Sequence, residues 1–167
     1  MIETPRLTLR EFEPTDLDAM RLVFGDEEVM HFGSGVQDDE YIRKFIESCR
    51  ANYRERGFGL WAVCEYENTR ALGYCGLTLF PDINGREEVE IGFRLARDVW
   101  GQGFATEAAM AVREFATDSL EFHRLIALID PQNQRSIRVA RKLGMQHEAD
   151  VMLPGYDHAD HVYMVET

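Results

Sequence analysis

The residues best suited to chemistry lie where an expected strand passes through a glycine-rich turn into an expected helix. Glycines stand at positions 101 and 103, and apolar residues at helical spacing begin at Ala105. Backbone N–H groups in the first turn of a helix have no partner within the helix, and the helix dipole adds positive potential there. Glycine removes side chains that would keep a ligand away from the backbone. The turn therefore predicts an anion site, although a Gly-x-Gly alone is a weak signal and a plain strand-to-helix turn is its alternative.

Two common classes of nucleotide-binding loop fit this segment poorly. A mononucleotide P-loop ends in Gly-Lys-Ser or Gly-Lys-Thr, whereas Gly103 is followed by Phe104 and Ala105. A dinucleotide fingerprint needs glycine or alanine where Thr106 stands, and it belongs near the start of its domain. The sequence therefore favours neither a nucleoside triphosphate nor NAD.

The residues around the turn resemble the pyrophosphate loop of the GNAT acetyltransferase superfamily. The stretch Trp-Gly-Gln-Gly-Phe-Ala-Thr-Glu-Ala, residues 100–108, is more narrowly similar to the RimJ/RimL-type branch. The similarity extends in the same order over nearly the whole chain. It includes residues 4–10, 57–63 and 72–77, which are similar to strands of that branch, and residues 133–139 and 142–145, which are similar to its later helix.

The resemblance implies a fold and a co-substrate. The fold is α/β (α+β) over residues 1–167, with a mixed, mostly antiparallel sheet of about seven strands, about four flanking helices and a V-shaped splay between strands 4 and 5. Acetyl-CoA would bind in the splay, where its pantetheine arm adds to the open edge like a further strand. The cofactor-binding positions that carry over are Arg94, Leu95, Ala96, Gly101, Gln102, Gly103, Phe104, Ala105, Thr106, Asn133 and Arg138.

Acetyl transfer to an amine requires a base for the amine and an acid for the departing thiolate. An amine of pKa about 8 to 10 is mostly protonated at neutral pH. Glu90 matches the glutamate base of some family members and points away from the apolar face of its strand, with a charge partner for Arg94 as the alternative. Ser136 matches a serine near the sulfur in the RimJ/RimL-type branch, with a first-turn hydroxyl that satisfies the backbone as the alternative. Ala140 stands where the family often has a tyrosine, which excludes a tyrosine acid there.

Two types of residue on the later helix have a structural as well as a functional interpretation. Asn133 matches an asparagine that binds pantetheine in the family, and asparagine is also among the best N-caps. Arg138, like Arg135 and Arg141, lies near one helix face, where it would meet coenzyme A phosphates or remain a solvated charge. The sequence leaves both choices open.

Aromatic and histidine residues are weaker candidates. Phe32 and Trp61 are expected walls of the acceptor pocket, with Tyr163 as a third, and core packing is the default for each. His158 and His161 stand among aspartates, which raises the alternative of a metal site. A polar turn between strands is favoured, so no metal is expected.

Apolar periodicity predicts the elements that must position these residues. Strands are expected near residues 6–12, 60–64, 71–80, 88–95 and 125–129, followed by two more strands around a turn at residues 154–155. Helices are expected from about residue 16, over 38–56, from 105 to about 120, and from 133 to 143, and a turn is expected at 81–85. No repeat or linker is present, so one domain is predicted.

Composition narrows the classes of partner. The net charge is −12, from 30 acidic against 18 basic residues, which disfavours nucleic acid and anionic membranes and favours a cationic partner. The three cysteines stand in unrelated contexts and are expected to be reduced and buried. With no secretory signal expected, the chain is assigned to the cytoplasm. Family members are often dimeric, so a homodimer is a candidate assembly on which the sequence itself is silent.

Two functions follow. The first is N-acetyltransferase activity: acetyl-CoA and a primary amine, from a protein N-terminus or a small molecule, bind together and the nitrogen attacks directly. The alternative is a coenzyme A-responsive binding module without turnover, which the missing tyrosine acid keeps open. Rate loss on substitution of Glu90 or Ser136 separates the two.

Overall fold

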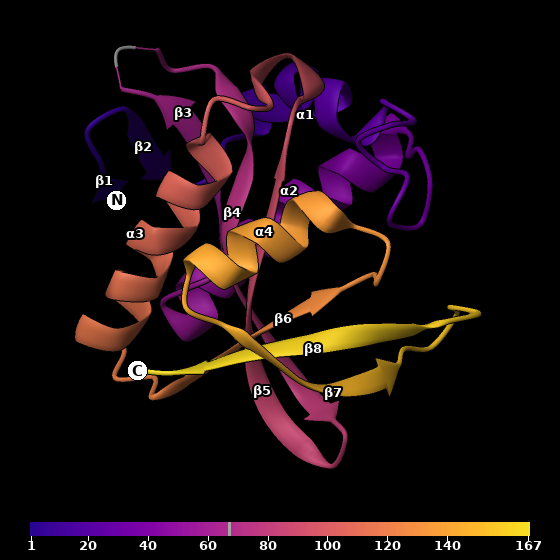
Figure 1. Ribbon diagram of the computed structural model, residues 1–167. Helices are drawn as coiled ribbons and strands as arrows, with labels where there is room; N and C mark the ends of the chain where they lie inside the picture. Colours follow the sequence, from indigo (N-terminus) through magenta and orange to yellow (C-terminus); the bar gives the residue numbers. More distant parts are fainter. Residues whose placement is uncertain (67) are drawn as a thin grey trace.

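A computed structural model describes residues 1–66 and 68–167, and within them eight strands form one twisted sheet (Figure 1). Their order is β1-β2-β3-β4-β5-β6-β8-β7. Every neighbouring pair is antiparallel except β5 and β6, which run parallel. The strands are β1 (Ile2–Glu3), β2 (Leu7–Arg10), β3 (Leu60–Glu65), β4 (Ala71–Ile83), β5 (Arg86–Leu95), β6 (Arg124–Ile129), β7 (Gln146–Met152) and β8 (Ala159–Glu166).

The mixed, mostly antiparallel sheet agrees with the fold expected from the sequence, with one strand more. The additional strand is β1, whose two residues pair with Thr8 and Leu9 of β2. It shifts the numbering, so the splay expected between the fourth and fifth strands lies between β5 and β6. These two strands are joined by one residue pair, Glu90 and Ile126, among the described residues.

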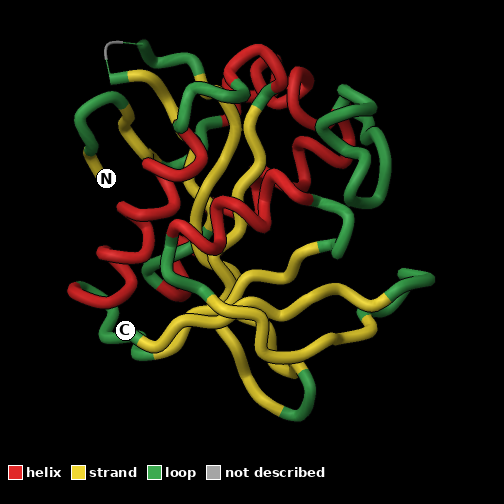
Figure 2. Tube along the Cα trace, in the orientation of Figure 1, coloured by secondary structure: helices red, strands yellow, loops and turns green. Residues whose placement is uncertain are grey.

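The helices cover both faces of the sheet, as Figure 2 shows with helices in red around yellow strands. One face packs against α1 and α2, where Phe24 and Phe45 contact Tyr74 of β4. On the other face Phe115 of α3 meets the ring of Trp61 at a centroid distance of 5.4 Å. The helices are η1 (Pro14–Asp16), α1 (Leu17–Phe24), α2 (Asp39–Arg56), η2 (Arg97–Val99), α3 (Phe104–Asp118) and α4 (Gln134–Lys142).

The bounds of α2 follow from the residues at its two ends. Asp38 is the N-cap, and its carboxylate accepts the backbone N–H of Tyr41 at 2.9 Å. Gly57 ends the helix with φ 76°, a left-handed conformation that glycine adopts without steric cost. The predicted helix over residues 38–56 is therefore confirmed to within one residue.

The first helix opens at Pro14 and Asp16 as expected, with these residues in the 3₁₀ turn η1 and the α-helical part from Leu17. The end predicted for the strand before residue 81 is wrong. Strand β4 continues through Pro81 and Asp82 to Ile83, and the hairpin turns at Asn84 and Gly85, both with positive φ. Residues 81 and 82 are exposed and lie beside an irregularity in the β4–β5 register, where proline needs no ladder partner.

The core lies mainly between the sheet and its helices, and a smaller cluster of Ile83, Ile126, Val151 and Val162 lies at the β6–β8 end. Cys49, Cys64 and Cys75 are buried, free thiols, as expected. Within the described residues, no helix has both the length and the apolar character needed to cross a membrane.

Candidate active site

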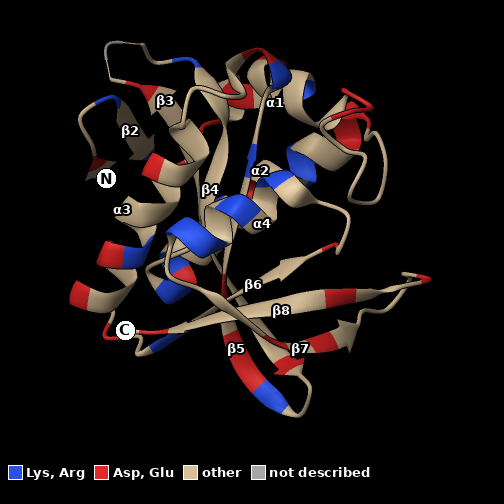
Figure 3. Cartoon of the chain, in the orientation of Figure 1, with Lys and Arg blue, Asp and Glu red and all other residues tan. Residues whose placement is uncertain are grey.

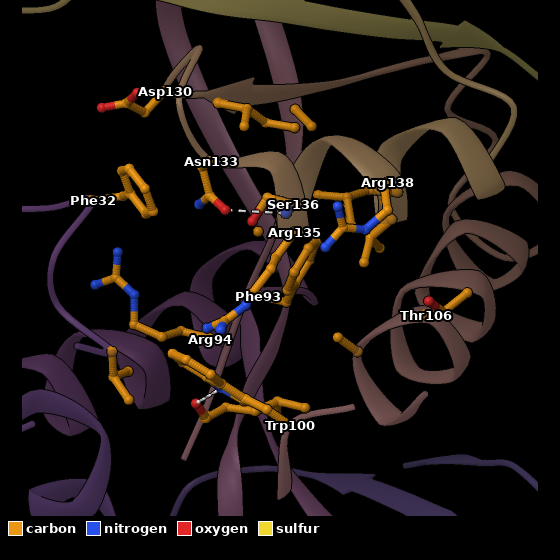
Figure 4. A pocket seen from close by; sticks show the side chains of 18 of the residues that line it. Phe32, Phe93, Arg94, Trp100, Thr106, Asp130, Asn133, Arg135, Ser136 and Arg138 are labelled. Carbon is orange, nitrogen blue, oxygen red and sulfur yellow. Dashed lines mark hydrogen bonds between the residues drawn. The ribbon is translucent and has the colours of Figure 1, made fainter. Parts of the chain in front are cut away.

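A cleft of about 1100 Å³ opens where β5 and β6 diverge. Residues 90–95 of β5 and 127–129 of β6 line its sides, and the first turns of α3 and α4 border it. The turn that follows α1, at residues 28–32, closes one end. In Figure 4 Thr106 lies at one end of this pocket, and Phe32 and Asp130 lie at the other. The divergence of two parallel strands thus produces one continuous site with two distinct ends.

The end at α3 has the features of an anion site. Gly101 and Gly103 have φ 78° and 83°, so both are left-handed, and both line the cleft. Gly103 is the N-cap of α3 and offers no side chain to the helix start. The first-turn N–H groups of Phe104, Ala105 and Thr106 therefore remain available, and the dipole of a 15-residue helix adds positive potential. The predicted anion turn has this geometry.

The N-terminal segment braces this turn. Arg6 donates from Nη1 to the carbonyl of Gln102 at 2.9 Å and from Nε to the carboxylate of Glu107 at 2.6 Å. Thr4 Oγ1 donates to the same carboxylate at 2.6 Å, and the Arg6 guanidinium lies 4.6 Å from the centre of the Phe104 ring. Although partial burial opposes it, these bonds hold the pKa of Glu107 below its usual value. The turn is therefore fixed from outside the cleft.

Trp100 connects the turn with β5 and α4. Its indole Nε1 donates to the carbonyl of Leu95 at 2.8 Å, and the Arg135 guanidinium lies 4.4 Å from the ring centre. Arg135 also forms an ion pair with Glu28 at 3.6 Å. The Leu95 carbonyl is thus occupied, and Arg135, although exposed and part of the cleft lining, contacts Glu28 and Trp100. Arg138 is also exposed at the cleft on α4, the basic helix of Figure 3, and has no such partner among the described residues, whereas Arg141 does not line the cleft.

Asn133 and Ser136 form the start of α4. The Asn133 side chain accepts the backbone N–H of Ser136 at 3.1 Å, so the N-cap interpretation of Asn133 is confirmed. The hydroxyl of Ser136 makes no hydrogen bond among the described residues, and Ser136 lines the cleft. The structural alternative for that hydroxyl, a bond to the helix backbone, is therefore not observed.

Glu90 lies at the vertex of the cleft. Its Oε1 accepts the backbone N–H of Leu128 across the splay at 3.2 Å. Burial raises the pKa of Glu90 to about 7, the Leu128 N–H and the charge of Arg94 oppose the rise, and Asp160 adds to it. No ion pair links Glu90 with Arg94 in the parts of the chain that the structure describes. A carboxyl group with a pKa near 7 is suited to proton transfer at neutral pH.

The end of the cleft away from α3 gathers charges of both signs. Asp160, at the start of β8, is 9% exposed and lines the cleft; its Oδ1 has no hydrogen-bond partner among the described residues. Burial and nearby Asp130 raise the pKa of Asp160, and His158, whose Nε2 lies 3.4 Å from Oδ1, opposes the rise. Phe32 and Arg94 form the opposite wall (Figure 4).

Some predicted site residues are not at the cleft. Trp61 was expected as a pocket wall, but it is 5% exposed and packs between Tyr53 and Phe115, so that prediction is wrong. Tyr163 is also buried outside the cleft, against His147 and His161. Both lie on strand faces that helices or neighbouring strands cover.

The remaining candidates are partly as expected. Neither Ala96 nor Gln102 belongs to the cleft lining. For Gln102 the reason is visible, since its carbonyl accepts Arg6 on the outer side of the turn. The residues Arg94, Leu95, Gly101, Gly103, Phe104, Ala105, Thr106, Asn133, Ser136, Arg138, Glu90 and Phe32 do line one cleft.

The histidines fall into two polar groups. His158 lies with Asp130 and Asp160, and His147 and His161 lie with Asp150. The turn between β7 and β8 contains His158, whereas His161 is part of β8. The predicted polar turn is therefore shorter than expected, and the first group borders the cleft through Asp130 and Asp160.

Sequence reasoning missed the Arg6–Glu107 brace and the place of Asp160. Both depend on contacts between residues far apart in the chain, 101 positions in the case of Arg6 and Glu107. For Asp160 a signal existed, since an acidic residue at the start of a strand otherwise rich in apolar residues is a candidate for a buried polar role.

Comparisons with known proteins agree with this architecture. The family model described as the acetyltransferase (GNAT) domain matches residues 6–146. Protein YkkB of Bacillus subtilis (strain 168) is 35% identical over 149 residues, which cover 89% of this chain and 86% of that protein. The uncharacterized N-acetyltransferase p20 of Bacillus licheniformis is 31% identical over 158 residues, covering 93% of this chain and 86% of that one. The crystal structure of the acetyltransferase from Agrobacterium tumefaciens strain C58 aligns with a TM-score of 0.83 and 28% identity, over 99% of this chain and 94% of that chain.

Proposed function

The chain belongs to the GNAT acetyltransferase family, an acetyl-CoA-dependent acyltransferase family, and we propose that it acetylates a primary amine by direct attack in a ternary complex. The observation that carries the proposal is the pairing of two features in one cleft. An uncapped helix start with two left-handed glycines lies at one end, and a carboxyl group with a pKa near 7 lies at the vertex.

The residues at the start of α3 fit the pyrophosphate of acetyl-CoA. The backbone N–H groups from Gly103 to Thr106 would bind its oxygens, because their direction and the helix dipole both favour an anion. Arg138 adds an exposed positive charge beside the same cleft. The open edge of β5 beyond Glu90 would accept the pantetheine arm.

Glu90 acts as the base in this proposal. An acceptor enters mostly as an ammonium ion, and the Glu90 carboxylate takes a proton from it directly or through a water molecule. The hydrogen bond from Leu128 holds the carboxylate in place at the vertex. Glu90 therefore supplies the neutral amine that attacks.

Ser136 acts as the acid. When the bond from nitrogen to the acetyl carbon forms and the carbon–sulfur bond breaks, the electron pair leaves on sulfur as a thiolate. The Ser136 hydroxyl, free of other hydrogen bonds among the described residues, donates a proton to that thiolate and is reprotonated from water. The hydroxide left by that water takes the proton that the nitrogen loses after attack, so the products are the amide and free coenzyme A, with the proton of the original ammonium ion on Glu90.

Within the family we assign the chain to the RimJ/RimL-type branch, on the support of residues 100–108 and of Ser136. Acceptors of that branch include protein N-terminal amines, and small amines are the other class considered. Three buried free thiols support a reducing compartment, the cytoplasm.

The test is thermal unfolding of the purified protein during titration with acetyl-CoA, with ADP and NAD as controls. Saturation at about 100 times Kd adds about 2.7 kcal/mol of stability. For a domain of this size the expected rise in Tm is about 5 to 10 °C.

Three outcomes separate the functions. A rise with acetyl-CoA and little with NAD, followed by release of free coenzyme A on addition of an amine, supports the proposal. A rise without turnover on any amine favours the binding module. No rise at millimolar acetyl-CoA contradicts both.

A further inference from the structure

Arg94 is a positive charge without an anionic partner at the acceptor end of the cleft. It is half-buried, and no carboxylate oxygen of the described residues lies within 4.0 Å of it. Among the described residues its only hydrogen-bond contact is from Nη1 to Met30 Sδ at 3.1 Å, and sulfur is a weak acceptor. The guanidinium packs against Gly33, where an added Cβ would lie 3.0 Å from Nη2. Most of its five N–H donors are therefore left unused in a partly dry site.

Carboxylates gather at the other side of the same region. Glu90 is on the same face of β5 as Arg94, four residues away, which corresponds to about 13 Å along the strand at about 3.3 Å per residue. Asp160 lines the cleft near Glu90 and has an unbonded buried oxygen, and Asp130, which pairs with His158 at 3.0 Å, lies beside Asp160. The acceptor end therefore has negative charge at the vertex and positive charge at its open side.

An acidic residue that could pair with Arg94 within the protein is already paired with other arginines. The nearby acid Glu28 pairs with Arg97 at 2.7 Å and with Arg135 at 3.6 Å. The phosphates of a coenzyme A molecule at the α3 turn would lie at the opposite end of the pocket from Arg94, as the positions of Thr106 and Arg94 in Figure 4 make clear. The acceptor is therefore the remaining bound molecule that could bring an anionic group to Arg94.

We propose that the acceptor is a small amine that carries a carboxylate, such as a free amino acid, and that Arg94 binds this carboxylate while the amine faces Glu90. The proposal rests on the proposed function and names the substrate class of the same site. A guanidinium binds a carboxylate through two parallel N–H···O bonds, which fixes both position and orientation. The carboxylates of Glu90 and Asp160 attract the ammonium group of the same molecule.

The experiment uses three series of matched compounds: leucine, phenylalanine and glutamine, each with its amide and with the amine that lacks the carboxylate. Initial rates of coenzyme A release are measured for the wild-type protein and for Arg94→Gln, Arg94→Lys and Arg54→Gln. Arg54 is an exposed arginine near the end of α2, outside the cleft, and serves as the matched control. Because the amine pKa differs within a series, the deciding quantity is the ratio of variant to wild type for each compound.

For the amino acids, Arg94→Gln is expected to lower kcat/KM about 10- to 100-fold, the range expected for hydrogen bonds to a charged partner. Arg94→Lys should recover part of this loss, and Arg54→Gln should leave the rates unchanged. For the amides and simple amines, Arg94→Gln should change kcat/KM less than about 3-fold. Equal losses for all compounds, or a wild-type protein that acetylates the simple amines and not the amino acids, would overturn the proposal.

A separate measurement distinguishes this proposal from the proposed function. The rise in Tm with acetyl-CoA should be the same in Arg94→Gln and wild type, because the family resemblance gives the pantetheine arm only the backbone of Arg94, which the substitution keeps, and the side chain lies away from the phosphates. If acetyl-CoA binds but no compound is acetylated, the test is the change in Tm when an amino acid is added to the protein saturated with coenzyme A. The amino acid must raise Tm in wild type, and Arg94→Gln must abolish that rise. Absence of such a rise contradicts the proposal even when the acetyl-CoA result stands.

Discussion

The Glu90 carboxylate accepts a hydrogen bond from the backbone N–H of Leu128 at 3.2 Å, so a side chain of β5 bridges to β6 where the two strands begin to separate. The bond favours the ionised form, while burial favours the neutral form and raises the pKa to about 7. The same group thus marks the vertex of the cleft and titrates within the physiological range.

The rate of acetyl transfer should depend on the ionisation of Glu90. Because the base must be deprotonated, kcat is expected to rise with pH through about 7 and then level off. Glu90→Gln should lower kcat by about 10²-fold or more and remove this limb from the profile. Measurement of kcat between pH 5.5 and 9 checks the prediction, and an unchanged limb in the variant would assign it to another group.

The same pKa predicts a gain in stability on removing the charge. Glu90 has a folded pKa above its unfolded value, so its contribution to stability is greatest below about pH 4.5 and is lost as pH rises to about 7. At pH 8 the free energy of unfolding of Glu90→Gln should therefore exceed that of wild type by up to about 3 kcal/mol, seen as unfolding at a higher denaturant concentration. At pH 4.5 the two should differ little. The exposed Glu114, changed to Gln, is the control and should show no such pH-dependent difference.

The glycine at the N-cap of α3 can be tested against a glycine of the same conformation elsewhere. Gly103 and Gly85 both have φ 83°, so replacement by alanine costs a similar 1 to 2 kcal/mol, about the penalty for a left-handed residue, in either place. Only at Gly103 would the new methyl meet a neighbour, Arg6 Nη2 at 3.4 Å, so the substitution disturbs the turn that borders the cleft. Gly103→Ala should weaken acetyl-CoA binding at least 10-fold by calorimetry, and Gly85→Ala should leave Kd unchanged. Equal effects would place the pyrophosphate elsewhere.

Two residues at the start of α4 should separate stability from catalysis. Asn133→Ala removes the N-cap and is expected to cost about 1 kcal/mol of unfolding free energy. Ser136→Ala removes a hydroxyl without a hydrogen bond among the described residues, so stability should stay within about 0.5 kcal/mol. Its kcat should fall about 10²-fold if the hydroxyl is the acid. Chemical denaturation and initial rates measure both, and a stable, fully active Ser136→Ala variant would exclude the serine acid.

The contact between Arg6 and Glu107, outside the cleft, should affect acetyl-CoA binding only through the position of the turn. Glu107→Gln removes the charge that holds Arg6 and leaves the cleft lining unchanged. We expect acetyl-CoA to bind about 3- to 10-fold more weakly, with a coupling to Arg6→Gln of about 1 kcal/mol in a double-mutant cycle on unfolding. Additive effects of the two substitutions would show that the ion pair does not fix the turn.

Local signals predicted the elements of this fold well where capping and glycine positions define an end. The N-cap at Asp38 and the left-handed Gly57 determine α2, and α3 begins at Phe104, one residue before its expected start. Strand ends were less predictable. Pro81 suggested a turn, but at the exposed end of a long hairpin a proline can continue the strand.

The site was predictable at the anion end and less so at the acceptor end. The turn at residues 101–106 is one continuous segment, so sequence and geometry coincide there. The acceptor end collects residues from the turn after α1, from β5 and from β8, which only the sheet brings together. Trp61 illustrates the limit, because alternation along β3 does not tell which face a cleft borders.

The single residue pair between β5 and β6 also divides the molecule by chain order. Strands β1 to β5 use only residues up to 95, and β6 to β8 use only residues from 124 on, so each half of the sheet is built from its own continuous part of the chain. A ligand that fills the cleft contacts both halves at once. A bound ligand would link the two halves of the sheet, so its binding should slow amide hydrogen exchange in the strands of both halves together.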